Sequence, residues 1–281
     1  MIWRTRRQTW DLSTRGLLMG ILNVTPDSFS DGGRYATPEE AGEWALQMIA
    51  DGADVVDIGG ESTRPGAEAV SAAEEWDRVG PVLEWLRPRT EAALSIDTSK
   101  ADVARAAIDT GVDILNDVTG FQDDAMVEAA RRSECGVVIM HMRGNPRTMQ
   151  REPEYEDVVR DVGNFLRHRR SAVLASGLNP DSIVLDPGIG FGKTPEHNRM
   201  LLAATGALSE LGAPLLIGLS RKSFLSAFTD QGTVSERIWP ALALTSFCRE
   251  HGARIFRVHD VRAHRDALRM TEVILNGVPD A

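Results

Sequence analysis

Short runs of aliphatic residues recur along the chain, and the longer segments between them have the 3.6-residue periodicity of amphipathic helices. The runs number eight and lie at Leu17–Val24, Val55–Ile58, Leu94–Ile96, Ile114–Leu115, Val137–Met140, Ile183–Leu185, Leu215–Leu219 and Ile255–Val258. They are largely apolar rather than alternating, which is typical of parallel strands that are covered on both faces. The pattern predicts eight β-strands that alternate with helices.

The predicted helices have recognisable boundaries. Thr37-Pro38-Glu39-Glu40 and Ser71-Ala72-Ala73-Glu74 have the form of a capping box, in which a hydroxyl and a glutamate satisfy opposite backbone donors. Four glycines close helical segments shortly before the next strand, as residues in a left-handed cap do. These are Gly52, Gly111, Gly177 and Gly252. The chain is therefore expected to repeat a βα unit.

Eight βα units within 281 residues favour a closed (β/α)8 TIM barrel. An open, doubly wound sheet is the competing fold, because the same alternation permits it. No linker or change of composition indicates a second domain. We therefore expect residues 1–281 to form a single-domain α/β barrel.

Composition narrows the classes of partner. The chain is 42% hydrophobic and carries 41 acidic against 31 basic residues, a formal net charge of -10. A broad surface for nucleic acid is therefore not expected, and any bound anion must be met by a local cluster of cations. Arg4, Arg6 and Arg7 precede no apolar targeting segment, and no run is long enough to span a membrane. Because Cys135 and Cys248 lack a CxxC spacing as well, we expect a cytoplasmic protein without nucleic-acid or membrane partners.

Polar residues stand at or just after the end of each apolar run. In chain order they are Asn23, Asp57, Asp97, Asn116, His141, Asp186, Ser220-Arg221-Lys222, Arg257 and His259. In a barrel these positions form the active site at the C-terminal ends of the strands. Any single one of them is as readily explained as a cap of the following helix, Asp57 and Asp97 especially. Eight that converge on one end of a barrel favour an active site.

The residue types suggest two kinds of contact. Asp97, Asp186 and Asn116 suit a flat heterocycle with N–H donors and ring acceptors, since an ionised carboxylate accepts a bidentate pair and an amide both donates and accepts. The cations suit a diphosphate or a carboxylate, and they are Arg64, Lys222, Arg257 and His259. The residues alone thus support a transfer reaction between a heterocycle with an anionic leaving group and a second, anionic substrate.

Two long motifs identify a family. Met19–Gly33 (MGILNVTPDSFSDGG) and Asp57–Gly66 (DIGGESTRPG) closely resemble the signatures of dihydropteroate synthases, in the pterin-binding enzyme family. Further motifs continue in family order at Ser95–Thr98, Leu115–Val118, Asp186–Lys193, Ser220–Ser223 and Arg257–Asp260. The resemblance covers the chain from about Leu17 to His264.

The resemblance implies an activity. Members of the family condense 6-hydroxymethyl-7,8-dihydropterin diphosphate with p-aminobenzoate to give 7,8-dihydropteroate and diphosphate, a step of folate biosynthesis that sulfonamides inhibit. It implies Mg²⁺ as cofactor, a dissociative mechanism and a homodimer formed through the last helices. The loops at residues 25–36 and 60–70 would close over the site.

The resemblance also assigns roles residue by residue. The pterin would be held by Asp97, Asn116, Met140, Asp186 and Lys222; the diphosphate by Asn23, Arg64, Arg257 and His259; and p-aminobenzoate by Phe29, Thr63, Pro65, Phe191 and Ser220. Asn23 would reach the metal, and Asp97, Lys222, Arg257 and His259 would be the catalytic residues. Met140 fits equally well as an ordinary core methionine.

The same sequence also permits other interpretations. Gly188–Lys193 has neither the glycine spacing of a dinucleotide fingerprint nor that of a P-loop. His141 could ligate a metal, although a lone histidine is more often hydrogen-bonded for structural reasons. A pterin-dependent methyltransferase would share the barrel but not the Thr25–Gly33 loop, and a catalytically silent pterin-binding paralogue would not need a diphosphate site. Ile238–Ala241 departs from the small residues expected at the start of the seventh helix.

Overall fold

The computed structural model describes residues 1–25, 37–62, 67–144, 149, 153–229 and 233–278. Eight parallel strands form its centre: β3 (Leu17–Asn23), β4 (Val55–Gly59), β5 (Ala93–Asp97), β6 (Ile114–Asp117), β7 (Gly136–Met140), β8 (Ile183–Asp186), β9 (Leu216–Gly218) and β10 (Ile255–Val258). Their order is β8-β7-β6-β5-β4-β3-β10-β9, and a parallel bridge between Leu185 and Leu215 joins β8 to β9. All eight predicted strands are confirmed, and the bridge closes the sheet into a barrel.

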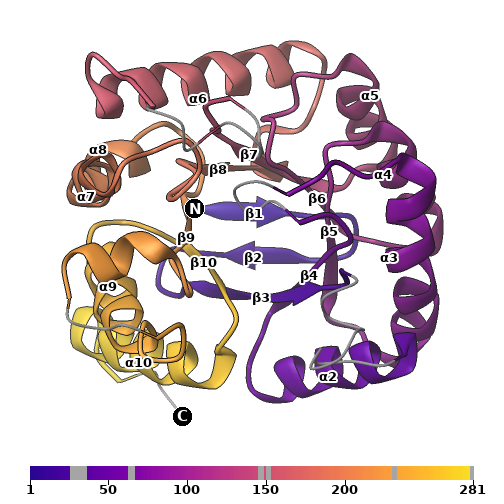
Figure 1. Ribbon diagram of the computed structural model, residues 1–281, viewed down its shortest axis with the longest axis horizontal. Helices are drawn as coiled ribbons and strands as arrows, with labels where there is room; N and C mark the ends of the chain where they lie inside the picture. The colour runs from indigo at the N-terminus through magenta and orange to yellow at the C-terminus, as the bar shows by residue number, and fades with distance from the viewer. Residues whose placement is uncertain (26–36, 63–66, 145–148, 150–152, 230–232, 279–281) are drawn as a thin grey trace.

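Helices surround the strands as a ring (Figure 1). They are α2 (Pro38–Ala50), α3 (Ala72–Leu86), α4 (Ala101–Thr110), α5 (Asp124–Ser133), α6 (Val158–Ala175), α7 (Pro195–Ala203), α8 (Thr205–Ser209), α9 (Ile238–Glu250) and α10 (Val261–Asn276), with short 3-10 turns at Arg87–Arg89, Pro180–Ser182 and Ser223–Ala227. Ser71 and Glu74 form the predicted capping box of α3, and the Thr37 side chain accepts from the Glu40 backbone N–H at the start of α2. The four predicted cap glycines all have positive φ, between +96° and +110°.

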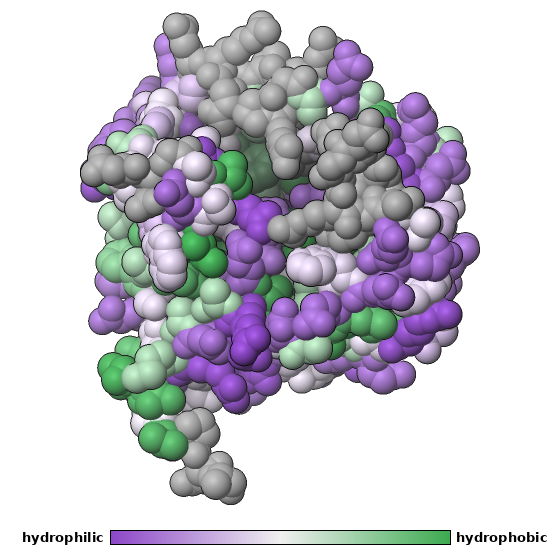
Figure 2. All heavy atoms as spheres, turned by 60° about the horizontal axis from the view of Figure 1, so that its bottom comes forward, coloured by the Kyte–Doolittle hydropathy of each residue, from purple (hydrophilic) through white to green (hydrophobic). Residues whose placement is uncertain are grey.

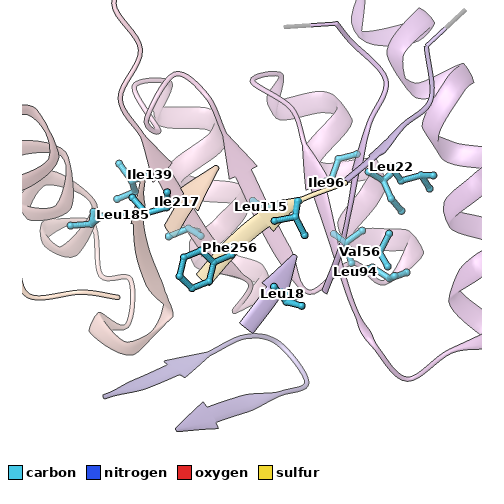
Figure 3. Packing of buried hydrophobic residues seen from close by; sticks show 14 of the residues in the cluster. Leu18, Leu22, Val56, Leu94, Ile96, Leu115, Ile139, Leu185, Ile217 and Phe256 are labelled. Carbon is cyan, nitrogen blue, oxygen red and sulfur yellow. The ribbon is translucent and has the colours of Figure 1, made fainter. Parts of the chain in front are cut away.

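Successive side chains on each strand alternate between the helices and the barrel interior. One set, which includes Leu18, Val56, Leu94 and Phe256, packs outward with the buried faces of the helices (Figure 3). The inward set is apolar at the N-terminal end of the barrel: Leu17, Met19, Val55, Ala93, Ile114, Val138, Val184, Leu216 and Ile255. The core therefore has two layers, one outside and one inside the sheet.

A hairpin at the N-terminus was not predicted. β1 (Ile2–Arg4) pairs antiparallel with β2 (Thr9–Asp11), and both lie within the ring of helices in Figure 1. Trp3 is fully buried, packs with Leu12 against the inward apolar layer, and donates its indole N–H to the Ser182 carbonyl at 3.2 Å. The hairpin thus covers the N-terminal end of the barrel. In the described part of the chain, no helix has the length and apolar character needed to cross a bilayer.

Candidate active site

The inward face of the strands turns polar toward their C-terminal ends. Because side chains repeat every second residue, Val55 is followed on this face by Asp57, and Ala93 by Ser95 and then Asp97. The same spacing leads to Asn23, Asn116, Met140, Asp186 and Arg257, and just past the strands to Ser220 and His259. One alternation thus places both the apolar layer and the candidate site, at opposite ends of the barrel.

Arg257 lies between two carboxylates. Its Nε donates to Asp57 Oδ2 at 2.6 Å, and its Nη2 donates to Asp97 Oδ2 at 2.6 Å. Asn116 Nδ2 donates to the same Asp57 oxygen at 3.0 Å, while the other Asp57 oxygen is buried without a hydrogen-bond partner among the described residues. Gly59 is the cross-strand partner of Asp97.

Burial decides the protonation of these groups. It raises the pKa of Asp97 from 3.8 to about 7, even though the Arg257 guanidinium opposes the shift. Burial lowers the pKa of Arg257, but Asp57 and Asp97 outweigh that effect, so the net shift of its pKa is upward. The guanidinium therefore stays charged. Asp97, in contrast, gains or loses its proton near neutral pH.

A second cation, Lys222, lies on the turn after β9. Its ammonium donates to the Ile189 carbonyl and lies 4.6 Å from the centre of the Phe191 ring. Gly190, with φ +84°, is needed between them because an added Cβ would come within 2.9 Å of Lys222 Cδ. Burial lowers the pKa of Lys222 to about 8, against the attraction of Asp186. Burial likewise raises the pKa of Asp186, with Lys222 as the main opposing charge.

The segments after β9 and β10 are tied together. Ser220 Oγ accepts from the His259 backbone N–H at 3.2 Å and lies 3.1 Å from His259 Nδ1. Arg221 has φ +62°, an uncommon conformation for a residue with a side chain, and its guanidinium makes two hydrogen bonds to Asp260, at 2.7 and 3.2 Å. This ion pair holds Ser220 and His259 side by side.

The structure brings most of the predicted residues to one end of the barrel. These are Asn23, Asp97, Asn116, Met140, Asp186, Phe191, Ser220, Lys222, Arg257 and His259. Phe29, Thr63, Arg64 and Pro65 lie outside the described residues. The carboxylates and the cations were expected as two sets, but the bonds of Arg257 to Asp57 and Asp97 join them into one cluster.

Sequence reasoning gave three residues too little weight. Asp57 was left open as a helix cap, yet it is fully buried and pairs with Arg257. Its place in the alternation after Val55 was the available signal. Lys193 was noted only within its glycine-rich motif, and His141 only as a possible metal ligand; the structure buries both, with Lys193 Nζ 3.0 Å from His141 Nδ1. No sequence pattern foretold that contact.

This donor and acceptor set can hold an uncharged polar ring and an anion side by side. Carboxylates and an amide offer acceptors for ring N–H groups, and Arg257 and Lys222 offer charge-assisted donors to an anion. In the described part of the chain, no group of three or more His, Cys, Asp or Glu side chains could hold a metal ion.

Comparison with known proteins gives a consistent result. The family model described as pterin binding enzyme matches residues 19–259. Dihydropteroate synthase of Haemophilus influenzae is 44% identical over 259 residues, covering 92% of this chain and 94% of that protein. The structure of Yersinia pestis dihydropteroate synthase with a sulfonamide drug is 42% identical, with a TM-score of 0.92 over 98% of this chain and 99% of that one.

A third relative carries the reaction product. Xanthomonas albilineans dihydropteroate synthase in complex with 7,8-dihydropteroate is 38% identical, with a TM-score of 0.88 over 99% of this chain and all of that one. Both sequence identity and fold therefore extend over nearly the full length of the proteins compared. The chain belongs to the pterin-binding enzyme family, among the dihydropteroate synthases.

Proposed function

We propose that this chain condenses 6-hydroxymethyl-7,8-dihydropterin diphosphate with p-aminobenzoate, giving 7,8-dihydropteroate and diphosphate, and that the inward polar layer carries the reaction. The observation that carries the proposal is Arg257 bonded to both Asp57 and Asp97 with Asn116 alongside. A ring with several N–H donors and an anionic leaving group needs such acceptors and such a cation together.

The pterin is assigned to the carboxylate end of the cluster. Asp97, Asn116 and Asp186 supply acceptors, and Asn116 a donor, for the edge of the ring. Lys222 supplies a further donor. The electrostatic attraction between its ammonium and the Asp186 carboxylate supports a joint role for the two residues. Met140, 4% exposed at the end of β7, would pack on the ring face.

The diphosphate is assigned to Asn23, Arg257 and His259, with Arg64 from outside the described residues. Arg257 keeps its charge at every relevant pH, because its pKa is raised by two carboxylates. The Asn23 amide oxygen, at the end of β3, is the kind of hard ligand that Mg²⁺ accepts together with phosphate oxygens and water. When bound, Mg²⁺ would neutralise charge on the diphosphate.

The p-aminobenzoate is assigned to Phe191 and Ser220, with Phe29, Thr63 and Pro65 from outside the described residues. Phe191 offers an aromatic face next to Lys222, and Ser220 offers a hydroxyl next to His259. An aromatic ring with a carboxylate fits between an apolar face and polar hydrogen-bonding groups. Sulfonamides would compete at the same position.

The proposed mechanism is dissociative. The bond between the pterin methylene carbon and the diphosphate oxygen breaks, and the diphosphate leaves with the electron pair. The aromatic amine then forms the C–N bond to the resulting cation and loses a proton. Arg257 and His259 would stabilise the leaving anion, and Asp97 and Asp186 the cation, so that no protein nucleophile takes part.

A homodimer is also proposed, through the last two helices. Trp239, Met270 and Ile274 on α9 and α10 are 68%, 60% and 75% exposed. Figure 2 shows hydrophobic residues gathered at the edge of the molecule where these helices lie. An exposed apolar patch of this kind is typical of an association surface. Sedimentation should give a dimer for the natural chain and a monomer for Ile274→Asp.

The activity is tested by mass spectrometry of the products from the pterin diphosphate, p-aminobenzoate and Mg²⁺. The proposal predicts dihydropteroate, and its loss when a chelator is added. A catalytically silent paralogue would bind the pterin without forming that product. A pterin-dependent methyltransferase would likewise fail to consume p-aminobenzoate.

A further inference from the structure

Lys193 is a buried cationic residue that the proposed chemistry does not use. It ends the motif that follows β8, and only 2% of its surface is exposed. No carboxylate lies within salt-bridge distance of its ammonium in the described part of the chain. A buried lysine without a carboxylate partner is costly, and burial lowers its pKa well below the usual value. The contacts around the Lys193 nitrogen must therefore compensate for its burial.

The nitrogen is enclosed by hydrogen-bond acceptors. Nζ lies 2.9 Å from the Gly188 carbonyl, 2.9 Å from the Phe191 carbonyl and 3.0 Å from His141 Nδ1. The His141 carbonyl is a fourth, longer contact at 3.4 Å. An ammonium group has three protons for the three shorter contacts, and a neutral amine keeps two, one each for the Gly188 and Phe191 carbonyls. In both protonation states Lys193 therefore links the start of the Gly188–Gly192 turn to its end.

The turn itself has a backbone shape that must be held. Every second residue of the turn is a glycine with positive φ: Gly188 has +65°, Gly190 +84° and Gly192 +62°. A side chain at Gly188 or Gly192 would meet the carbonyl oxygens of His141 or Arg143, at 1.9 and 2.4 Å. Glycines permit this shape but do not stabilise it, since they are also the residues with most freedom to leave it.

The turn carries two groups that contact Lys222, a residue of the candidate site. The Ile189 carbonyl lies between the two clamped carbonyls, and the Phe191 ring belongs to the residue that carries the second one; both groups contact the Lys222 ammonium. We propose that Lys193 is a positioning residue: its Nζ clamps the Gly188 and Phe191 carbonyls and so fixes Phe191 and the Ile189 carbonyl beside Lys222. This role rests on the proposed function of Phe191 and Lys222, but the clamp itself does not.

The first test compares Lys193→Met with the natural chain. Methionine fills much of the same space without a donor. We expect kcat/KM for p-aminobenzoate to fall by on the order of 10²-fold, the size of effect that misplacing a binding group has. We also expect faster hydrogen exchange at the Gly190 and Phe191 amides, which now bond to Asn198 and Gly188. Unchanged exchange with unchanged kcat/KM would overturn the proposal.

Arg249→Met is the matched control. Arg249 is 3% exposed and binds Glu272 and the Thr14 carbonyl, away from the turn. It should lower the melting temperature while leaving kcat/KM and the exchange of the turn amides as they are. Equal effects of the two variants on the turn amides would show general destabilisation and would contradict a specific role for Lys193.

A second variant serves in case Lys193→Met does not fold. In Lys193→Ala the missing side chain leaves space for a small amine, so ethylammonium should restore the protection of the turn amides, and ethanol should not. No restoration by ethylammonium would overturn the clamp. Because exchange is measured without substrates, failure of the proposed function would show separately, as an inactive natural chain with an intact, Lys193-dependent turn.

Discussion

Arg257 and Asp97 are separated by 160 positions in the sequence, and a hydrogen bond of 2.6 Å joins Nη2 of one to Oδ2 of the other. The same guanidinium also holds Asp57, so one cation balances two carboxylates inside the barrel. The two acids come from neighbouring strands, since β4 pairs with β5. Removal of the cation would leave two buried carboxylates facing each other.

Arg257→Met is therefore expected to destabilise the protein. Breaking a buried charge cluster at one partner costs about 3 kcal/mol or more, because the remaining charges keep their desolvation penalty. Urea denaturation at neutral pH should show the loss, and the double variant Arg257→Met with Asp57→Asn should recover part of it. Full stability of the single variant would contradict the ion-pair account.

Asp97 should make stability depend on pH. In the folded protein its pKa is raised from 3.8 to about 7, so at intermediate pH the folded state holds a proton that the unfolded chain has released. The free energy of unfolding should therefore fall as pH rises from 3.8 to about 7 and then level off. Asp97→Asn should remove this contribution. If the two proteins show the same slope in urea denaturation across this range, Asp97 is not the titrating group.

Lys222 should set the alkaline limit of activity. Its pKa is lowered to about 8, so the ammonium that binds Ile189 and faces Phe191 is lost as pH rises through that value. We expect kcat/KM to decline on the alkaline side of pH 8. Lys222→Arg, which keeps a charge at that pH, should have lower activity but no such limb. A limb that persists unchanged in Lys222→Arg would assign it to another group.

Trp3 should matter for stability and not for chemistry. It is fully buried against the apolar inward layer, packs against the tilted ring of Trp10 with 5.2 Å between ring centres, and lies at the end of the barrel opposite the candidate site. Trp3→Ala should lower the free energy of unfolding by about 3 to 5 kcal/mol. Steady-state kinetics at a temperature where the variant is folded should match the natural chain. A change in KM would show that the two ends of the barrel communicate.

The sequence was sufficient to predict the eight strands and the end of the barrel that carries the site. Continuous apolar runs such as Val137–Met140 mark strands covered on both faces, and polar residues such as Asp186 mark where each strand leaves the core. Both signals are local, so they can be read without knowing which strands are neighbours.

The hairpin and the pairing of charges could not be predicted in the same way. β1 and β2 have three residues each, too few for a period-2 pattern. Trp3 is buried only because the hairpin covers the N-terminal end of the barrel. Asp57 and Arg257 are brought together only because β10 pairs with β3, which in turn pairs with β4. The contact between Lys193 and His141 likewise depends on two loops that meet in space.

The most direct test of the account is the rate of dihydropteroate formation by Asp97→Asn, measured beside the natural chain and Asp102→Asn. Asp102 is a matched control, since its carboxylate is 81% exposed on α4 and, among the described residues, binds only Arg105. The account predicts that Asp97→Asn loses a factor on the order of 10² or more in kcat/KM while keeping a cooperative melt, and that Asp102→Asn does not change. Equal activity of all three proteins would contradict the assignment of the chemistry to the inward polar layer.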